Sequence, residues 1–143
     1  VEGHQLTGGD LTADGQVVIR PVKPDTIAKS LAIGNPADGP YALDVVRRTG
    51  GAIADVSDAE VVEGITLLAR TEGIFAETAG GVVVATYRKL LAEGAIDPAA
   101  EVVLLNTGDG LKTLDAVAPT SQPTFTISPS FDDFETAYSE VTP

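Results

Sequence analysis

The residues with the clearest chemical potential lie in one turn, Asn106-Thr107-Gly108-Asp109-Gly110. The turn follows Val102–Leu105, an apolar, β-rich run typical of a strand that is covered on both faces, as in a parallel sheet. Two glycines two residues apart let the backbone turn tightly or admit a ligand closely. Because ligands of open α/β sheets gather at the carboxyl ends of strands, the pattern predicts that Thr107 points a hydroxyl into a crevice. An ordinary strand-to-helix turn is the alternative that the pattern leaves open.

Composition limits the kinds of site that the chain can build. Its 143 residues, 43% of them hydrophobic, fit a single domain, 1–143. There is no Cys and His4 is the one histidine, which excludes a cysteine nucleophile and argues against a Ser-His-Asp or multi-histidine metal site. Asp10 and Asp14 lack the further acidic ligands of a calcium-binding loop, so a solvated loop is expected there. No metal site is expected.

Charge and hydropathy narrow the range of partners. The formal net charge is −12 and the sequence pI is near 4.2, which argues against nucleic acid and against anionic lipid surfaces. No apolar run approaches the roughly 20 residues of a membrane helix, and no basic leader is present, so a cytoplasmic location is expected by elimination. The chain starts at Val1 and contains no Met, which suggests a processed product, an excised domain or the tail of a longer protein.

Helical and extended patterns alternate along the chain after an irregular initial segment, 1–23. Alternation of this kind implies an α/β fold, a three-layer αβα sandwich with a mostly parallel sheet. The clearest helix start is Ser57-Asp58-Ala59-Glu60, a capping box. A tail, 119–143, is expected to pack on the domain through an aromatic stripe, Phe131, Phe134 and Tyr138. The expected strands are 16–20, 52–56, 102–105 and 124–127, and the expected helices are 25–32, 38–48, 58–72, 78–93, 111–117 and one from residue 130.

Six short motifs between Pro24 and Leu114 follow one another at regular places. In chain order they are Thr26-Ile27-Ala28-Lys29-Ser30, Ile33-Gly34-Asn35-Pro36, Thr49-Gly50-Gly51, Val56-Ser57-Asp58-Ala59-Glu60, Glu72-Gly73-Ile74-Phe75-Ala76-Glu77 and Thr107-Gly108-Asp109-Gly110-Leu111-Lys112. In this order and at these intervals, the chain resembles the threonine synthases. These are fold-type II pyridoxal phosphate enzymes, with a domain like that of tryptophan synthase β.

The resemblance implies an enzyme that converts O-phosphohomoserine, a small amino-acid substrate, and water to threonine and phosphate on pyridoxal 5′-phosphate. In the family, a lysine that forms the Schiff base and a Gly-rich phosphate loop lie upstream of this region, which closes the pocket from the other side. Thr107 matches the hydroxyl residue that hydrogen-bonds the pyridine nitrogen, and Gly108 matches a position where the backbone passes close to the ring. The matching borders of the substrate pocket are Ile33, Gly34, Asn35, Glu77 and Thr78.

Two positions depart from the family pattern. Thr78 stands where the family commonly has Pro, and Asp109 stands where it commonly has His, which places an acid near the cofactor edge. Lys29 and Lys89 have the character of solvated surface residues, and Lys112 does not match the family's Schiff-base lysine. No catalytic residue is therefore expected within this chain.

The resemblance also implies partners for the chain. It is expected to be a carboxyl-terminal portion that is inactive alone, that pairs with its own missing amino-terminal part and that assembles as a homodimer. A half-sheet with an open edge would favour such association. Two alternatives stay open: a freestanding ligand-binding or regulatory module that kept the fold without catalysis, and a structural fragment with no activity.

Overall fold

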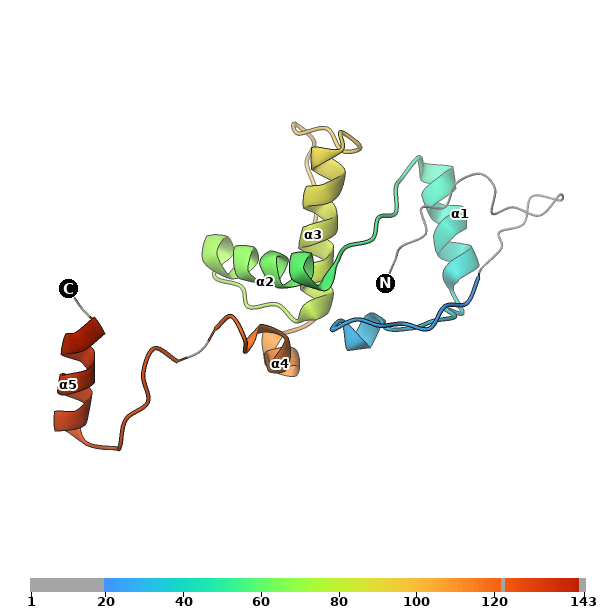
Figure 1. Cartoon of the computed structure of the whole chain (residues 1–143). Coiled ribbons are helices and arrows are strands. Elements are labelled where there is room, and N and C mark those ends of the chain that lie inside the picture. Colours follow the sequence, from blue (N-terminus) through green and yellow to red (C-terminus); the bar gives the residue numbers. More distant parts are fainter. Residues whose placement is uncertain (1–19, 122, 142–143) are drawn as a thin grey trace.

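The computed structural model describes residues 20–121 and 123–141 (Figure 1). Asp10, Asp14 and most of the expected strand 16–20 lie outside the described residues. In chain order the elements are η1 (Lys29–Leu31), α1 (Gly39–Thr49), α2 (Asp58–Glu72), α3 (Thr78–Ala92), η2 (Gly110–Thr113), α4 (Leu114–Val117) and α5 (Phe131–Val141), where η marks a 3₁₀ helix.

Helix α2 confirms the range that the sequence predicts, and its start is the predicted capping box. The Ser57 hydroxyl accepts a hydrogen bond from the Glu60 N–H at 3.3 Å, and the Glu60 carboxylate accepts one from the Ser57 N–H at 2.7 Å. Gly73 ends the helix with a φ of 69°, a left-handed conformation that glycine adopts without a Cβ penalty. Both ends of α2 are therefore set by residues adjacent to it in sequence.

Helices α2 and α3 cross steeply at the centre of the molecule (Figure 1). Gly64 and Gly81 lie at the crossing. A Cβ added to Gly64 would stand 2.6 Å from the Gly81 carbonyl oxygen, and one added to Gly81 would stand 2.5 Å from the Val61 carbonyl oxygen. The two backbones are therefore in contact, which residues with side chains would prevent.

The hydrophobic core lies on the inner face of α2. Val61 and Ile65 are buried there, as the sequence predicts, and Leu68 and Ala69 from the same predicted stripe are half-buried. Val117 of α4 completes the buried cluster. The half-buried residues packed around it are Ile27, Val56, Phe75 and Val82.

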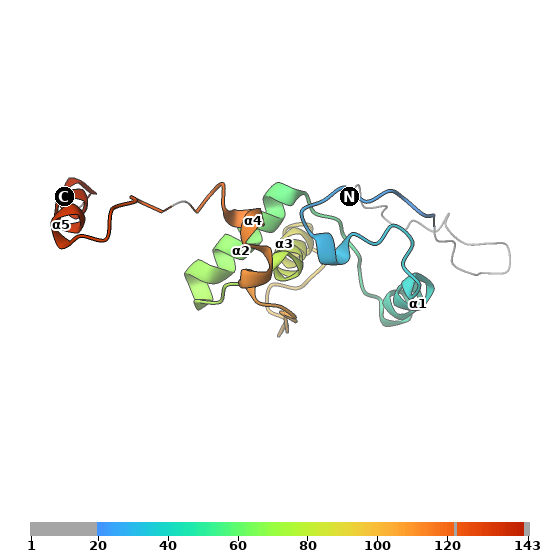
Figure 2. The same cartoon turned by 90° about the horizontal axis from the view of Figure 1, so that it is seen from below.

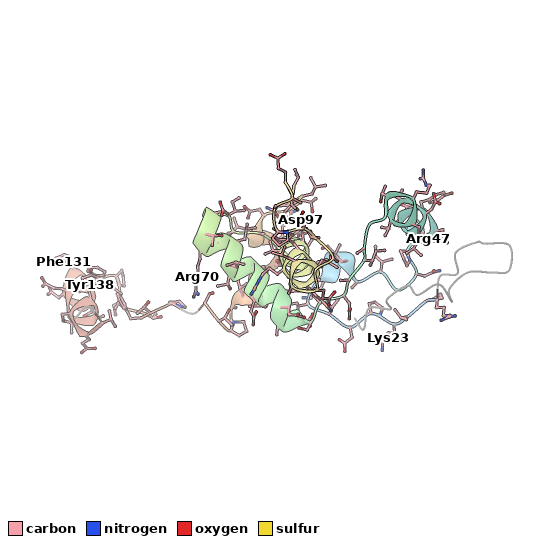
Figure 3. The ribbon with its side chains drawn as sticks, turned by 90° about the horizontal axis from the view of Figure 1, so that it is seen from above. Lys23, Arg47, Arg70, Asp97, Phe131 and Tyr138 are labelled. Carbon is pink, nitrogen blue, oxygen red and sulfur yellow. The ribbon has the colours of Figure 1, made fainter. Side chains whose placement is uncertain are left out.

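Helix α1 also agrees with its predicted position. Pro40 lies in its first turn, where the missing N–H costs little, and Gly50 ends it with a φ of 67°. Figures 1 and 2 place α1 away from the α2–α3 pair. Arg47 of this helix and Lys23 lie on the same side of the molecule (Figure 3).

The helix predicted over 25–32 is only one 3₁₀ turn, so that prediction is wrong in extent. Thr26 does not cap a helix. Its hydroxyl donates to the Asp58 carboxylate at 2.6 Å, and the Ile27 N–H donates to the same carboxylate at 3.2 Å. These bonds tie the backbone before η1 to the first turn of α2, and a helix starting at residue 25 would not reach that carboxylate in the same way.

The described residues form no β-strand. One isolated antiparallel bridge joins Ala76 to Asp109, while the stretches 52–56, 102–105 and 124–127 carry no regular secondary structure. A strand is stabilised by hydrogen bonds to a neighbouring strand, and none of these three stretches has such a neighbour in the described part of the chain. The three-layer sandwich and its parallel sheet stay predictions.

Helix α5 confirms the helix predicted from residue 130, but it stands apart from α2 and α3 (Figures 1 and 2). Figure 3 shows Phe131 and Tyr138 on this separate helix. Phe134 stacks on Tyr138 with ring centroids 5.5 Å apart, and it meets Phe125 at 6.1 Å. Within the aromatic stripe, Phe134 thus packs against Tyr138 and against Phe125 of the same tail, and the docking of the stripe on the domain stays a prediction.

The described part of the chain has neither a metal-binding cluster nor a membrane-spanning helix. No group of three or more His, Cys, Asp or Glu side chains there is arranged to hold a metal ion. None of the described helices has the length and the apolar character needed to cross a membrane.

Candidate functional site

The turn that contains Thr107 is attached to the segment that leads into α3. The Glu77 N–H donates to the Gly108 carbonyl at 3.1 Å, and the Gly110 N–H donates to the Phe75 carbonyl at 2.9 Å. The Phe75 ring also fills the space beside Gly110, where an added Cβ would stand 2.5 Å from a ring carbon. Two backbone hydrogen bonds and one ring contact therefore fix the position of the turn.

Both sequence neighbours of Thr107 contact the start of α3. Asn106 Oδ1 occupies the space beside Gly80, 2.5 Å from where a Cβ would stand. The Glu77 carboxylate lies against Gly108, where an added Cβ would overlap it. Thr107 itself is exposed, so it is a surface hydroxyl residue held between two anchored neighbours.

The run that leads to this turn is exposed as well. Val103 is 85% exposed and Leu105 is 72% exposed. The sequence predicts that the run is covered on both faces, and the described residues do not cover it. The crevice expected at Thr107 therefore needs a surface other than those that residues 20–121 and 123–141 supply.

Glu77 is a carboxylate residue that the fold nearly buries, with 7% of the residue exposed. Its Oε1 lies 3.8 Å from Lys112 Nζ, and the Lys112 side chain is 61% exposed. Solvent screens an ion pair of this kind, so it holds the carboxylate weakly. The contact with Gly108 and the backbone hydrogen bond do more to fix Glu77 than the ion pair does.

Thr78, the other predicted pocket border in this segment, is fully buried. Its N–H donates to the Thr113 hydroxyl at 3.2 Å, while its own hydroxyl has no hydrogen-bond partner among the described residues. Most buried polar atoms in folded proteins are paired. The start of α3 therefore retains one unsatisfied polar group.

Asp109 has a structural task in this turn. Its Oδ1 accepts a hydrogen bond from the Leu111 N–H at 2.8 Å and so caps η2. A capping carboxylate at the start of a helix is also favoured by the helix dipole. The acid that departs from the family pattern thus shapes the chain that follows Gly108.

The predicted border Ile33-Gly34-Asn35 lies in a separate loop. The Gly34 carbonyl accepts from the Val22 N–H at 2.9 Å, and Gly34 lies so close to the Val22 carbonyl that an added Cβ would overlap it. Ile33 and Asn35 are exposed. The preceding turn η1 packs against α3, but among the described residues no hydrogen bond or ion pair joins this loop to the Thr107 turn.

Each of the three lysines considered as a possible Schiff-base residue, Lys29, Lys89 and Lys112, forms an ion pair with a carboxylate. Lys29 Nζ lies 2.9 Å from the Asp115 carboxylate, and this ammonium holds the pKa of the Asp115 carboxyl below its ordinary value. Lys89 Nζ donates to the Asp55 carbonyl at 2.8 Å and lies 3.4 Å from the Asp55 carboxylate. Lys89 is half-buried, so it is less solvated than the sequence predicts.

Sequence reasoning missed one residue at this site, Thr113. Its hydroxyl binds the first N–H of α3 from 35 positions along the chain. A lone threonine in a polar stretch carries no pattern that predicts such a contact. Only the packing of η2 against the start of α3 reveals it.

Comparison with known proteins places this turn in a family. A protein-family model described as "Pyridoxal-phosphate dependent enzyme" matches residues 3–108, and this match ends within the turn. The chain belongs to the pyridoxal-phosphate dependent enzyme family. The family indicates pyridoxal phosphate as the cofactor, in agreement with the expectation from the motifs.

Three relatives of this pyridoxal-phosphate dependent enzyme chain are threonine synthases. This chain is 46% identical over 99 residues to the threonine synthase of Methanocaldococcus jannaschii, a match that covers 69% of this chain and 24% of that protein. It is 38% identical over 112 residues to the threonine synthase of Halalkalibacterium halodurans, covering 78% of this chain and 31% of that protein. It is 35% identical over 122 residues to the threonine synthase of a Bacillus strain, a match that covers 85% of this chain and 34% of that protein. The chain thus spans about a quarter to a third of the length of these curated relatives.

Two hydroxyl residues, one in the turn and one at the start of α3, are chemically able to hydrogen-bond a cofactor. Thr107 is exposed, and Thr78 in the first turn of α3 has a buried hydroxyl without a hydrogen-bond partner among the described residues. The cation of this turn, Lys112, is paired with Glu77. In this pyridoxal-phosphate dependent enzyme chain, the exposed Thr107 hydroxyl fits a hydrogen bond to the nitrogen of the cofactor ring.

Proposed function

We propose that this chain is the carboxyl-terminal part of a threonine synthase-like lyase, which in its assembled form converts O-phosphohomoserine and water to threonine and phosphate. The observation that carries the proposal is the similarity to threonine synthases at 35–46% identity over most of this chain. The anchored Thr107 turn supports it, because a cofactor-contacting residue has to be held in place.

The bound cofactor would supply an electron sink for the reacting amino acid. Thr107 would bind the pyridine nitrogen with its hydroxyl, and a neutral hydroxyl does not enforce a protonated ring. Gly108 would lie where the backbone passes close to the ring. Glu77 and Thr78 would border the pocket at the start of α3, with Ile33, Gly34 and Asn35 as a second border.

The remaining part of the protein would complete this pocket. The exposed run Val102–Leu105 would become a covered strand of a parallel sheet once that part adds neighbouring strands. Because the lysine that bonds the cofactor would lie in that part, this chain alone would be inactive. The ion pairs of Lys29, Lys89 and Lys112 agree with this, since a lysine that bonds a carbonyl must be a neutral amine. The assembled enzyme would be a homodimer.

A mixing experiment tests the proposal. The chain is combined with the remaining part of the protein, and cofactor absorbance and phosphate release from O-phosphohomoserine are measured for each part and for the mixture. Both signals should appear only in the mixture. Cofactor binding by the chain alone would favour a freestanding ligand-binding module instead. A mixture that binds the cofactor but releases no phosphate would reject O-phosphohomoserine as the substrate.

A variant at Thr107 tests its proposed role. Thr107→Val keeps the shape and removes the hydroxyl, so the mixture should lose about tenfold in kcat/KM, the equivalent of one hydrogen bond of about 1.4 kcal/mol. Thr107→Ser should retain most activity. Thr124→Val, at an exposed threonine of the tail, serves as the control. Full activity of Thr107→Val would remove Thr107 from the site.

A further inference from the structure

We infer that Glu77 is a positioning residue for Thr107, acting through the contact of its side chain with Gly108. This inference rests on the proposed function only for what Thr107 does once it is in place. The contact itself belongs to this chain and needs no cofactor.

The argument starts from the exposure of Thr107. An exposed residue in a turn has many rotamers and backbone states open to it unless its neighbours are fixed. Here Gly108 is held twice by one residue: the Glu77 N–H donates to its carbonyl at 3.1 Å, and the Glu77 carboxylate lies against its Cα. The position of Thr107 is therefore set from its carboxyl side by Glu77.

The requirement for glycine at 108 comes from this contact and not from the backbone. The glycines with positive φ among the described residues are Gly50, Gly73 and Gly94, so Gly108 has a backbone that alanine can adopt. What excludes a methyl group is the Glu77 carboxylate, which occupies the place of the missing Cβ. The two residues are thus complementary in shape, and a change in one should be compensated by a change in the other.

Packing, and not charge, carries this complementarity. Lys112 approaches Glu77 Oε1 to only 3.8 Å and is mostly exposed, so the ion pair is screened. On this account a neutral glutamine should replace Glu77 well, because it has nearly the same volume. An alanine should not, because it leaves Gly108 without a neighbour on that side.

A double-mutant cycle on the chain without cofactor tests the inference. The variants are Glu77→Ala, Glu77→Gln, Gly108→Ala and the combination of Glu77→Ala with Gly108→Ala, and Glu93→Ala at the far end of α3 is the control. The readouts are the NMR chemical shift of the Thr107 methyl group and the amide exchange rate of Gly110, whose N–H closes the turn onto Phe75. Circular dichroism checks that the helices persist.

Gly108→Ala should shift the Thr107 methyl signal and speed Gly110 exchange about tenfold, which corresponds to one lost hydrogen bond. Glu77→Ala should shift the signal as well. In the double variant, the Thr107 methyl shift and the Gly110 exchange rate should return toward the values of the parent chain. Both values should be those of the parent chain in Glu77→Gln and in Glu93→Ala. If Gly108→Ala fails to fold, a folded double variant supports the inference equally.

Two results would overturn it. Effects of Glu77→Ala and Gly108→Ala that simply add would show that the two side chains do not compete for one space. If Lys112→Gln changes the Thr107 methyl shift as much as Glu77→Ala does, the ion pair and not the packing positions Thr107. Because these readouts need no cofactor, they stand or fall separately from the activity of the assembled enzyme.

Discussion

The Asp58 carboxylate accepts a hydrogen bond from the Thr26 hydroxyl at 2.6 Å, and the two residues are 32 positions apart in the sequence. The same carboxylate accepts from the Ile27 N–H at 3.2 Å, and the Thr26 hydroxyl accepts from the Ala28 N–H at 3.2 Å. One acid at the start of α2 thus fixes the backbone that leads into η1. Because η1 in turn packs against α3, this acid connects three elements of the fold.

Removal of the Asp58 carboxylate should destabilise the chain. Asp58→Ala leaves the half-buried Thr26 hydroxyl and Ile27 N–H without their acceptor, and we expect a loss of about 1–3 kcal/mol in the free energy of unfolding, measured in urea. Asp38→Ala, at an acid before α1 that makes no side-chain capping bond, should change stability by less than about 0.5 kcal/mol. Equal losses in both variants would contradict the role of this contact.

The capping box should make stability depend on pH. Hydrogen bonds from the Ser57 N–H and hydroxyl hold the pKa of the Glu60 carboxyl below its ordinary value of 4.5. A carboxyl with a lowered folded pKa contributes stability that is fully present above its unfolded pKa and is lost as pH falls through the folded pKa. Glu60→Gln should therefore narrow the difference in unfolding free energy between pH 7 and pH 3, and an unchanged difference would contradict this role of the capping box.

Loss of the Ser57 hydroxyl should also lower the stability of the chain near neutral pH. Ser57→Ala removes the side-chain acceptor for the Glu60 N–H, and we expect about 1 kcal/mol less stability near neutral pH. Thermal unfolding followed by circular dichroism would measure it. A Ser57→Ala variant as stable as the parent would mean that α2 is held by packing alone.

The crossing of α2 and α3 should not tolerate a methyl group. In Gly64→Ala the new Cβ would meet the Gly81 carbonyl oxygen at 2.6 Å, so the helices must separate, at a cost of about 1–3 kcal/mol. Gly51→Ala is the matched control, because its nearest neighbour would stand at 3.4 Å. Urea unfolding of both variants compares them, and a stable Gly64→Ala would refute the close crossing.

The exposed apolar run should make the isolated chain associate with itself or with the remaining part of the protein. Val103→Lys places a charge in this run and should lower the weight-average mass measured by light scattering. Leu111→Lys changes a leucine outside the run that is 71% exposed, and it should have less effect. A parent chain that stays monomeric at high concentration would count against this surface.

The amino-acid sequence by itself determined the features that depend on near neighbours. The limits of α2 follow from Ser57, Glu60 and Gly73, and those of α1 follow from Pro40 and Gly50, because a cap is made by residues within one turn of the helix end. The motif order also predicted the family, which the comparison confirmed.

Only the tertiary structure decided the contacts between distant residues. It turned the helix expected at 25–32 into a single 3₁₀ turn, since Asp58 offers Thr26 a partner that no local pattern shows. It placed the Glu77 carboxylate in the space left by Gly108, and within the described part of the chain it left the Val102–Leu105 run without a neighbouring strand. Such contacts depend on how separate elements pack, and a strand exists only when another strand lies beside it.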